Sequence, residues 1–162
     1  MDIVPAIVSQ YLAALEMLRQ AVVKCPDSLW DDVADRTKFW HVAYHILFYT
    51  HFYLQDAEET FTPWSKYREG YHRFDPPKAG NGVVAYDKQS VLEYLDFCRA
   101  QVRERLQVLD LDAPSGFYWL PFNKLELQLY TIRHIQQHTG ELMERLGTRA
   151  GLELDWIGTQ HD

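Results

Sequence analysis

The chain has 162 residues, of which 47% are hydrophobic and 24% are charged, and its formal net charge is −7. This length predicts a single domain, residues 1–162, with a core large enough to fold without disulfides or structural zinc. The acidic charge and the absence of any run of basic residues argue against nucleic acid as a partner, and no apolar stretch is long enough to span a membrane.

The first two helices are expected in the N-terminal third of the chain. Over residues 3–23, apolar side chains recur at intervals of three and four, as on one face of a helix. A short helical turn after it is expected to tuck Trp30 inward. The second long helix is predicted at 38–57, with Thr37 as its N-cap. It is apolar on almost every side, which indicates a central, buried helix.

Two more helices are predicted in the second half. The third covers 87–109, with Asp87 as a capping residue. The fourth covers 124–147, begins after the capping residue Asn123 and is expected to end at Gly147. The fold class is therefore all-α, a four-helix bundle.

Three segments lack a helical period. Residues 58–86 and 110–122 are rich in proline and glycine and form long connections between helices two and three and between helices three and four. The first is expected to be an ordered loop, pinned to the bundle by aromatic residues that include Trp64 and Phe74. Residues 148–162 are expected to be a C-terminal tail that packs on the bundle, with Trp156 folding back onto it.

Four of the seven histidines form two pairs with H-x-x-x-H spacing: His41 with His45, and His134 with His138. Chance would give about 0.3 such pairs in this chain. Residues four apart share one face of a helix, so two imidazoles can approach one metal ion. A third histidine from a facing helix would leave coordination positions open, as in catalytic metal sites. The residues alone leave open which histidine of the second helix takes part.

The surroundings of these pairs differ. The face of the fourth helix with His134 and His138 lies more than about 110° from apolar positions such as Leu129, so it is either a solvent face or a polar site inside the bundle. Glu141 is expected to be solvated or paired with Arg145. The face around His45 is aromatic and expected to be buried.

The other histidines are weaker candidates. His51 points about 120° away from His45 on the second helix, and His72 and His161 are expected to be exposed. Cys25 and Cys98 are expected to be reduced and packed, since they form no C-x-x-C motif.

Two strings, FWHVAYHILFY at 39–49 and HIQQHTGEL at 134–142, together with the bundle length, resemble the DinB/YfiT-like superfamily. The resemblance implies a four-helix bundle, commonly a homodimer, with a divalent metal ion such as zinc or nickel. It implies that the ligands are His45, His134 and His138. Where many relatives have His-Arg-Gly-Gln at the last ligand, this chain has His-Thr-Gly-Glu. Characterised relatives include transferases and isomerases that use low-molecular-weight thiols.

Two classes of function follow. The first is a metal-dependent enzyme, of the thiol-dependent transferase or hydrolase type, with a small-molecule substrate and with Tyr49, Tyr130 and Glu141 near the ion. The second is a non-enzymatic dimeric binding module with a structural or vestigial ion, which a fourth ligand such as His41 would favour. A cytoplasmic location is expected, because the N-terminus lacks a secretory signal pattern.

Overall fold

The computed structural model describes residues 2–74 and 83–161. The four long helices are α1 (Val4–Lys24), α3 (Phe39–Tyr53), α4 (Lys88–Arg105) and α5 (Lys124–Ala150), and the short ones are α2 (Asp27–Trp30) and the 3₁₀ helix η1 (Glu58–Thr60). Within the described ranges there is no strand, and the expected all-α four-helix bundle is confirmed. None of the helices in these ranges is long and apolar enough to cross a membrane.

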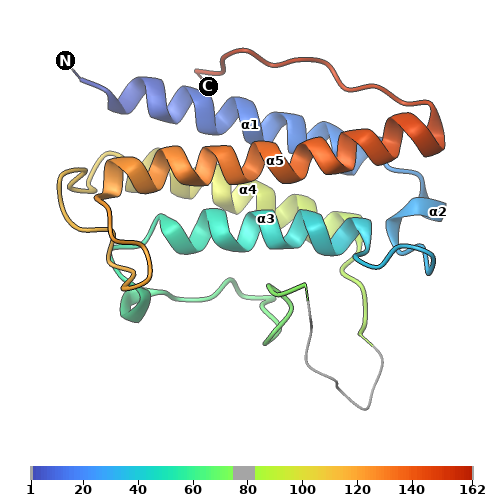
Figure 1. Cartoon of the computed structure of the whole chain (residues 1–162), viewed down its shortest axis with the longest axis horizontal. Coiled ribbons are helices and arrows are strands. Elements are labelled where there is room, and N and C mark those ends of the chain that lie inside the picture. The colour runs from blue at the N-terminus through green and yellow to red at the C-terminus, as the bar shows by residue number, and fades with distance from the viewer. Residues whose placement is uncertain (1, 75–82, 162) are drawn as a thin grey trace.

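The helices are arranged as two antiparallel layers that share one core (Figure 1). Helices α1 and α5 run in one direction, and α3 and α4 run in the other. Both α1 and α3 pack against α4 and α5, so α1 and α3 lie at opposite corners of the bundle. The chain therefore crosses the bundle diagonally twice, once from α1 to α3 and once from α4 to α5. The sequence had left this topology open.

Helix α3 is the most buried element, as its all-round apolar pattern predicts. Every residue of α3 is buried except His45 and Tyr49. The connection after α3 covers it, and the Trp64 ring of this connection stacks on Tyr94 of α4 with centroids 4.4 Å apart. The two less buried residues mark the place where α3 can be reached from outside the core.

The second helix, expected at about 38–57, begins within one residue of the prediction, at Phe39, but ends earlier, at Tyr53. Its N-cap is Lys38 rather than Thr37, and no side chain caps it. It ends at Tyr53, after which the Gln55 amide closes a tighter turn onto the Phe52 carbonyl oxygen at 3.2 Å. The buried Lys124 Nζ of α5 donates to the carbonyl oxygens of Gln55 at 3.1 Å and Asp56 at 2.7 Å and so stabilises the backbone beyond the helix.

The predicted capping residues of the last two helices are confirmed. Asp87 accepts a hydrogen bond from the Ser90 amide at 2.7 Å, and the Asn123 side chain accepts one from the Glu126 amide at 2.9 Å. Their C-terminal ends differ from the prediction. Helix α4 stops at Arg105 rather than at 109. Helix α5 continues through Gly147 and ends before Gly151, whose positive φ of 64° terminates it.

The segment after α5 runs back along α1 (Figure 1). Lys24 Nζ donates to the Glu153 carbonyl at 2.8 Å, and the Gln160 amide donates to Ser9 Oγ at 3.3 Å. Trp156 does not fold inward as expected, since its side chain is 74% exposed. Hydrogen bonds to α1 and the packing of Leu152 and Leu154 against the core, rather than this aromatic ring, hold the segment.

Candidate metal centre

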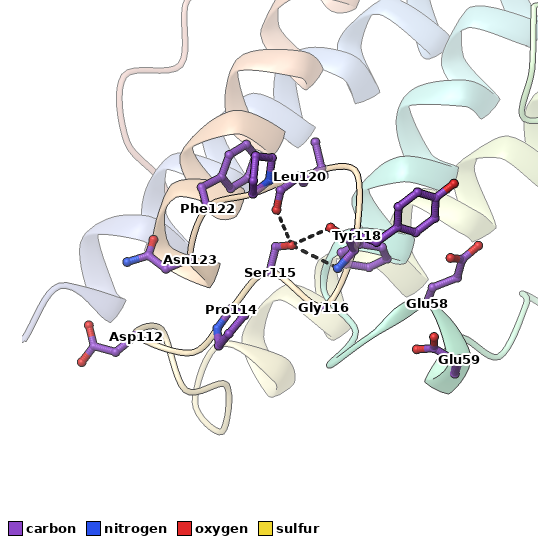
Figure 2. A pocket seen from close by; sticks show the side chains of 12 residues that line it. Glu58, Glu59, Asp112, Pro114, Ser115, Gly116, Tyr118, Leu120, Phe122 and Asn123 are labelled. Atoms are coloured by element: carbon purple, nitrogen blue, oxygen red, sulfur yellow. Dashed lines mark hydrogen bonds between the residues drawn. The ribbon is translucent and has the colours of Figure 1, made fainter.

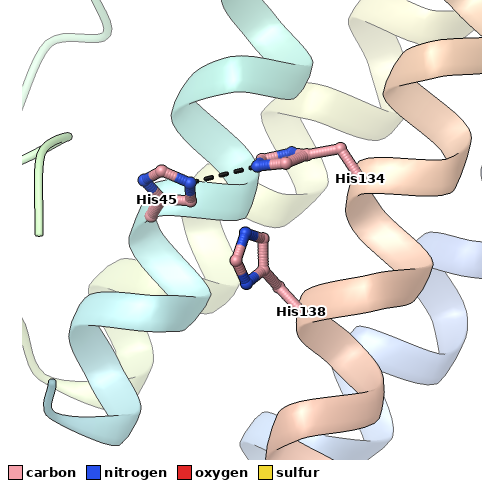
Figure 3. Close-up of side chains that lie close together, drawn as sticks. All are labelled: His45, His134 and His138. Atoms are coloured by element: carbon pink, nitrogen blue, oxygen red, sulfur yellow. Dashed lines mark hydrogen bonds between the residues drawn. The ribbon is translucent and has the colours of Figure 1, made fainter.

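Three histidine side chains meet between α3 and α5 (Figure 3). His45 comes from α3, and His134 and His138 come from successive turns of α5, on one face of the helix. One ring nitrogen of each lies within 4.8 Å of the other two, and the Nε2 atoms of His45 and His134 are 3.0 Å apart. His138 is buried, and the other two are partly buried. The structure thus brings the three candidates into one cluster.

The connection after α3 orients the His45 ring. Its Nδ1 lies 2.7 Å from the backbone carbonyl oxygen of His72. A carbonyl oxygen only accepts hydrogen bonds, so Nδ1 carries the hydrogen and Nε2 of the neutral ring carries a lone pair. This lone pair faces the other two histidines (Figure 3).

Glu141 orients the His138 ring in the same way. Its Oε2 lies 3.1 Å from His138 Nδ1, so the carboxylate accepts a hydrogen bond from Nδ1 and leaves the lone pair on Nε2. The expected partner of Glu141, Arg145, instead lies 3.7 Å from Asp35 and donates to the backbone of Thr37. A carboxylate behind a histidine is the arrangement that commonly supports metal-binding imidazoles.

The donor set suits a divalent ion that prefers nitrogen ligands. Imidazole nitrogens bound at 2.0–2.1 Å to a tetrahedral ion lie about 3.3 Å from one another. The Nε2 atoms of His45 and His134 are 3.0 Å apart, and all three ligand nitrogens lie within 4.8 Å of one another, so they fit such an ion after small rotations. His134 Nδ1 is buried without a hydrogen-bond partner among the described residues.

Burial favours the neutral form of two of the three imidazoles, those of His45 and His134. It lowers the pKa of His45 to about 3 and that of His134 to about 4. The neighbouring His138 lowers both pKa values further, since two adjacent imidazolium ions repel, whereas the His72 carbonyl opposes the shift of His45. Neutral imidazole is the form that binds a metal ion.

A cavity of about 270 Å³ opens beside the cluster and is lined by two of the histidines and three tyrosines: His45, Tyr49, Tyr53, Tyr130 and His134. Burial raises the pKa of Tyr49, and it raises that of Tyr53 to about 12. These two hydroxyl groups stay protonated at neutral pH and can donate hydrogen bonds. The cavity gives a small molecule a route to the histidines.

The other histidine of the first pair lies outside the cluster. His41 Nε2 donates to the backbone carbonyl oxygen of Tyr71 at 2.8 Å. Its ring stacks on Trp40, with centroids 4.9 Å apart. Of the two histidines that the sequence left open, the one beside His134 and His138 is His45.

The remaining histidines also lie apart from the cluster. His51 is buried, and its Nδ1 is 3.2 Å from the Tyr94 hydroxyl. His161 is exposed, as expected. The expectation that His72 is exposed was wrong, because it is half-buried and stacks on Phe48 with centroids 4.3 Å apart.

Both cysteines are packed and carry no sign of reactivity. Cys25 and Cys98 are free and buried, as expected. Burial raises the pKa of Cys25 to about 11 and holds that of Cys98 well above its usual range. Neither side chain is a thiolate at neutral pH, the form needed for nucleophilic attack.

A larger cavity, of about 670 Å³, lies between η1 and the connection before α5 (Figure 2). Its lining residues are Glu58, Glu59, Asp112, Pro114, Ser115, Gly116, Phe117, Tyr118, Leu120, Pro121, Phe122 and Asn123. The Ser115 hydroxyl is used within the loop, where it donates to the carbonyl oxygens of Phe117 and Leu120. With no histidine or cysteine in its lining, this cavity lacks the donors of the cluster.

Some parts of the histidine site have no recognisable signal in the sequence. The His72 carbonyl is a backbone group, which the residue type does not reveal. Phe74 stacks on His45 with centroids 4.1 Å apart and lies 5.5 Å from the His138 ring. The sequence marked Phe74 only as one of the aromatic residues that pin the connection, and Tyr53 only as part of an apolar helix.

The fold and the site together define a class of protein, a four-helix bundle with a candidate three-histidine metal site between two of its helices. A family model described as DinB superfamily matches residues 10–142, and the chain belongs to that superfamily. The matched range includes all three histidines, and it confirms the resemblance seen in the motifs. Searches of curated proteins and of solved structures gave no match.

Proposed function

We propose that this protein binds a divalent metal ion, zinc or nickel, through His45, His134 and His138. We further propose that it is a metal-dependent enzyme, of the thiol-dependent transferase or hydrolase type, with a small-molecule substrate. The observation that carries the proposal is the direction of the imidazole lone pairs. Hydrogen bonds on the Nδ1 atoms of His45 and His138 leave the lone pairs on the two Nε2 atoms, which face the same space (Figure 3). A bound ion would lower the pKa of a water molecule or a low-molecular-weight thiol and so supply a nucleophile.

The protein's own groups would bind and orient the reactants. The protonated hydroxyl of Tyr49 and the side chain of Tyr130 line the cavity beside His45 and His134. They are placed to hydrogen-bond a substrate oxygen. Glu141 holds the His138 ring and is itself exposed, so its carboxylate can exchange protons with solvent.

The alternative, a non-enzymatic dimeric module with a structural ion, has less support. A structural zinc site is closed by four protein ligands, whereas the grouping found among the described residues contains three. The cavity next to His45 and His134 supplies space for a water molecule or a thiol at the remaining position. An open position of this kind is typical of catalytic sites.

Metal analysis of untagged protein tests the proposal. We expect about one divalent ion per chain, and we expect its loss in the variant His45→Ala. The matched control is His51→Ala, which removes another buried histidine of α3 outside the cluster. If the purified protein has no metal and neither zinc nor nickel changes its melting temperature, the proposal is wrong.

Cobalt substitution separates the enzyme from the structural module. An open site should change its visible absorption spectrum when a thiol or azide is added, because these molecules enter the coordination shell. A spectrum that stays unchanged would favour the closed, structural site.

We also propose that the protein is a homodimer, as the family resemblance implies. Light scattering measures the mass in solution directly. A mass of one chain, 19.1 kDa, at micromolar concentration would contradict the dimer.

A further inference from the structure

Residues 71–74, which we call the strap, lie across the histidine side of α3. His41 donates to the carbonyl oxygen of the first strap residue, Tyr71, and His45 donates to that of the second, His72. We propose that His41 is a positioning residue for the metal centre, because it holds the strap whose next carbonyl fixes the tautomer of His45. This inference rests on the metal site proposed above.

Two side chains one helical turn apart bind two consecutive carbonyl groups of the strap. The distances are 2.8 Å from His41 Nε2 to the Tyr71 oxygen and 2.7 Å from His45 Nδ1 to the His72 oxygen. Both donors stand on the rigid backbone of α3. If the first bond is lost, the strap keeps other contacts, such as the stacking of His72 on Phe48, but the second carbonyl loses the hydrogen bond next to it and its distance from the His45 ring varies more.

The position of His41 itself is fixed by packing. Its side chain is only 5% exposed, and its ring lies between Trp40, at 4.9 Å, and Phe74, at 5.7 Å. Phe74 in turn stacks on His45. Removal of the His41 ring therefore loosens the strap at a hydrogen bond and at an aromatic contact, both next to the candidate ligand.

The consequence for metal binding follows from the two tautomers of imidazole. With the His72 carbonyl in place, the hydrogen is on Nδ1 and the lone pair of His45 faces the cluster. Without it, part of the population carries the hydrogen on Nε2 and cannot bind the ion there. The apparent affinity falls in proportion to the competent fraction. Loss of the groups that support metal ligands typically weakens metal binding 10–100-fold, so we expect about tenfold here.

Three variants test this role. His41→Ala removes the donor, whereas His41→Gln places an amide N–H near the position of Nε2 and should restore most of the affinity. His51→Ala is the matched control, a buried histidine of the same helix whose partner is Tyr94. Competition with a chelator measures the zinc affinity of each. We expect His41→Ala to bind zinc about tenfold more weakly, and the other two to bind it nearly as tightly as the wild type.

A second measurement does not depend on a bound metal ion. Long-range ¹H–¹⁵N NMR spectra of the metal-free protein report which ring nitrogen of each histidine carries the hydrogen. We expect the Nδ1–H form for His45 in the wild type and in His41→Gln, and a mixture in His41→Ala.

The outcomes are distinguishable. Wild-type zinc affinity in a folded His41→Ala variant, or an equal loss in His51→Ala, overturns the positioning role. A wild-type protein that binds no metal overturns the proposed function, while the NMR spectra still decide whether His41 controls the His45 tautomer. If His41→Ala does not fold, His41→Phe replaces it, because a phenyl ring fills the space of the imidazole without a donor for the Tyr71 carbonyl. A mixture of His45 tautomers in His41→Phe supports the role, and a pure Nδ1–H form overturns it.

Discussion

Acidification should strongly destabilise the metal-free protein, because three histidines are held neutral inside the fold. Burial lowers the pKa to about 3 for His45 and to about 4 for His134 and His51, against 6.5 for an ordinary histidine. Below pH 6.5 the unfolded chain therefore binds protons that the folded chain does not. The free energy of unfolding falls as the pH falls, and each group stops contributing near its folded pKa.

The expected size of the effect follows from these values. For each proton bound only by the unfolded chain, the free energy of unfolding falls by about 1.4 kcal/mol per pH unit. Each histidine therefore lowers it by about 2 kcal/mol between pH 6.5 and pH 5. Three such groups together lower the free energy of unfolding by about 6 kcal/mol, which is comparable to the whole stability of many domains. The carboxyl groups with lowered pKa, such as Asp87 and Glu93, have ordinary values of 3.8 and 4.5, and their effect lies mainly below this range.

Urea unfolding of chelator-treated protein between pH 7 and pH 5 measures this dependence. The variant His51→Leu removes one of the three groups without touching the cluster, and should reduce the pH dependence by about a third. A change of less than about 2 kcal/mol between pH 7 and pH 5 in the wild type would refute the reasoning. It would mean that the imidazoles accept protons in the folded state and are not enclosed as the structure describes.

Three further predictions concern the metal site and one helix end. Zinc at 100 times its dissociation constant should stabilise the protein by about 2.7 kcal/mol, which is about 5–10 °C in melting temperature, and His138→Ala should abolish this shift. Glu141→Leu should weaken zinc binding about tenfold in a chelator competition, whereas Glu144→Leu, a nearby exposed control, should not. Asn123→Ala should lower the stability in urea by about 1 kcal/mol, since it removes the side-chain cap of α5; an unchanged midpoint would contradict that role.

The parts of the fold that depend on local chemistry could be predicted from the sequence. The spacing of apolar residues identified the four long helices. The capping side chains of Asp87 and Asn123 identified the residues at which two of these helices begin. The errors arose where distant residues compete for the backbone. Lys124 binds carbonyl groups after α3, and Arg145 binds the carbonyl group of Thr37 before it, so side chains of α5 contact the backbone at both ends of α3. No property of residues 37–57 alone reveals these contacts.

The same distinction applies to the candidate site. The spacing of the histidines placed His134 and His138 on one face of a helix, but it did not separate His41 from His45 on the other helix. The choice depends on the strap, which begins thirty residues after His41 in the chain. A loop whose carbonyl groups bind one histidine and orient the next is a tertiary arrangement. Residue types in the loop, apart from its aromatic side chains, do not indicate it.

The inward face of α5 combines buried polar side chains with buried aliphatic ones. The helix leaves Leu129 54% exposed while it buries Gln128, Thr131 and His138 in the bundle. Buried polar groups cost free energy unless they are hydrogen-bonded, and part of this cost is offset by the bond of 2.7 Å from the Tyr11 hydroxyl to Gln128. The same face of α5 also buries Leu127, Ile135, Leu142 and Leu146 completely. One orientation of α5 therefore completes the core and also brings its two histidines to α3.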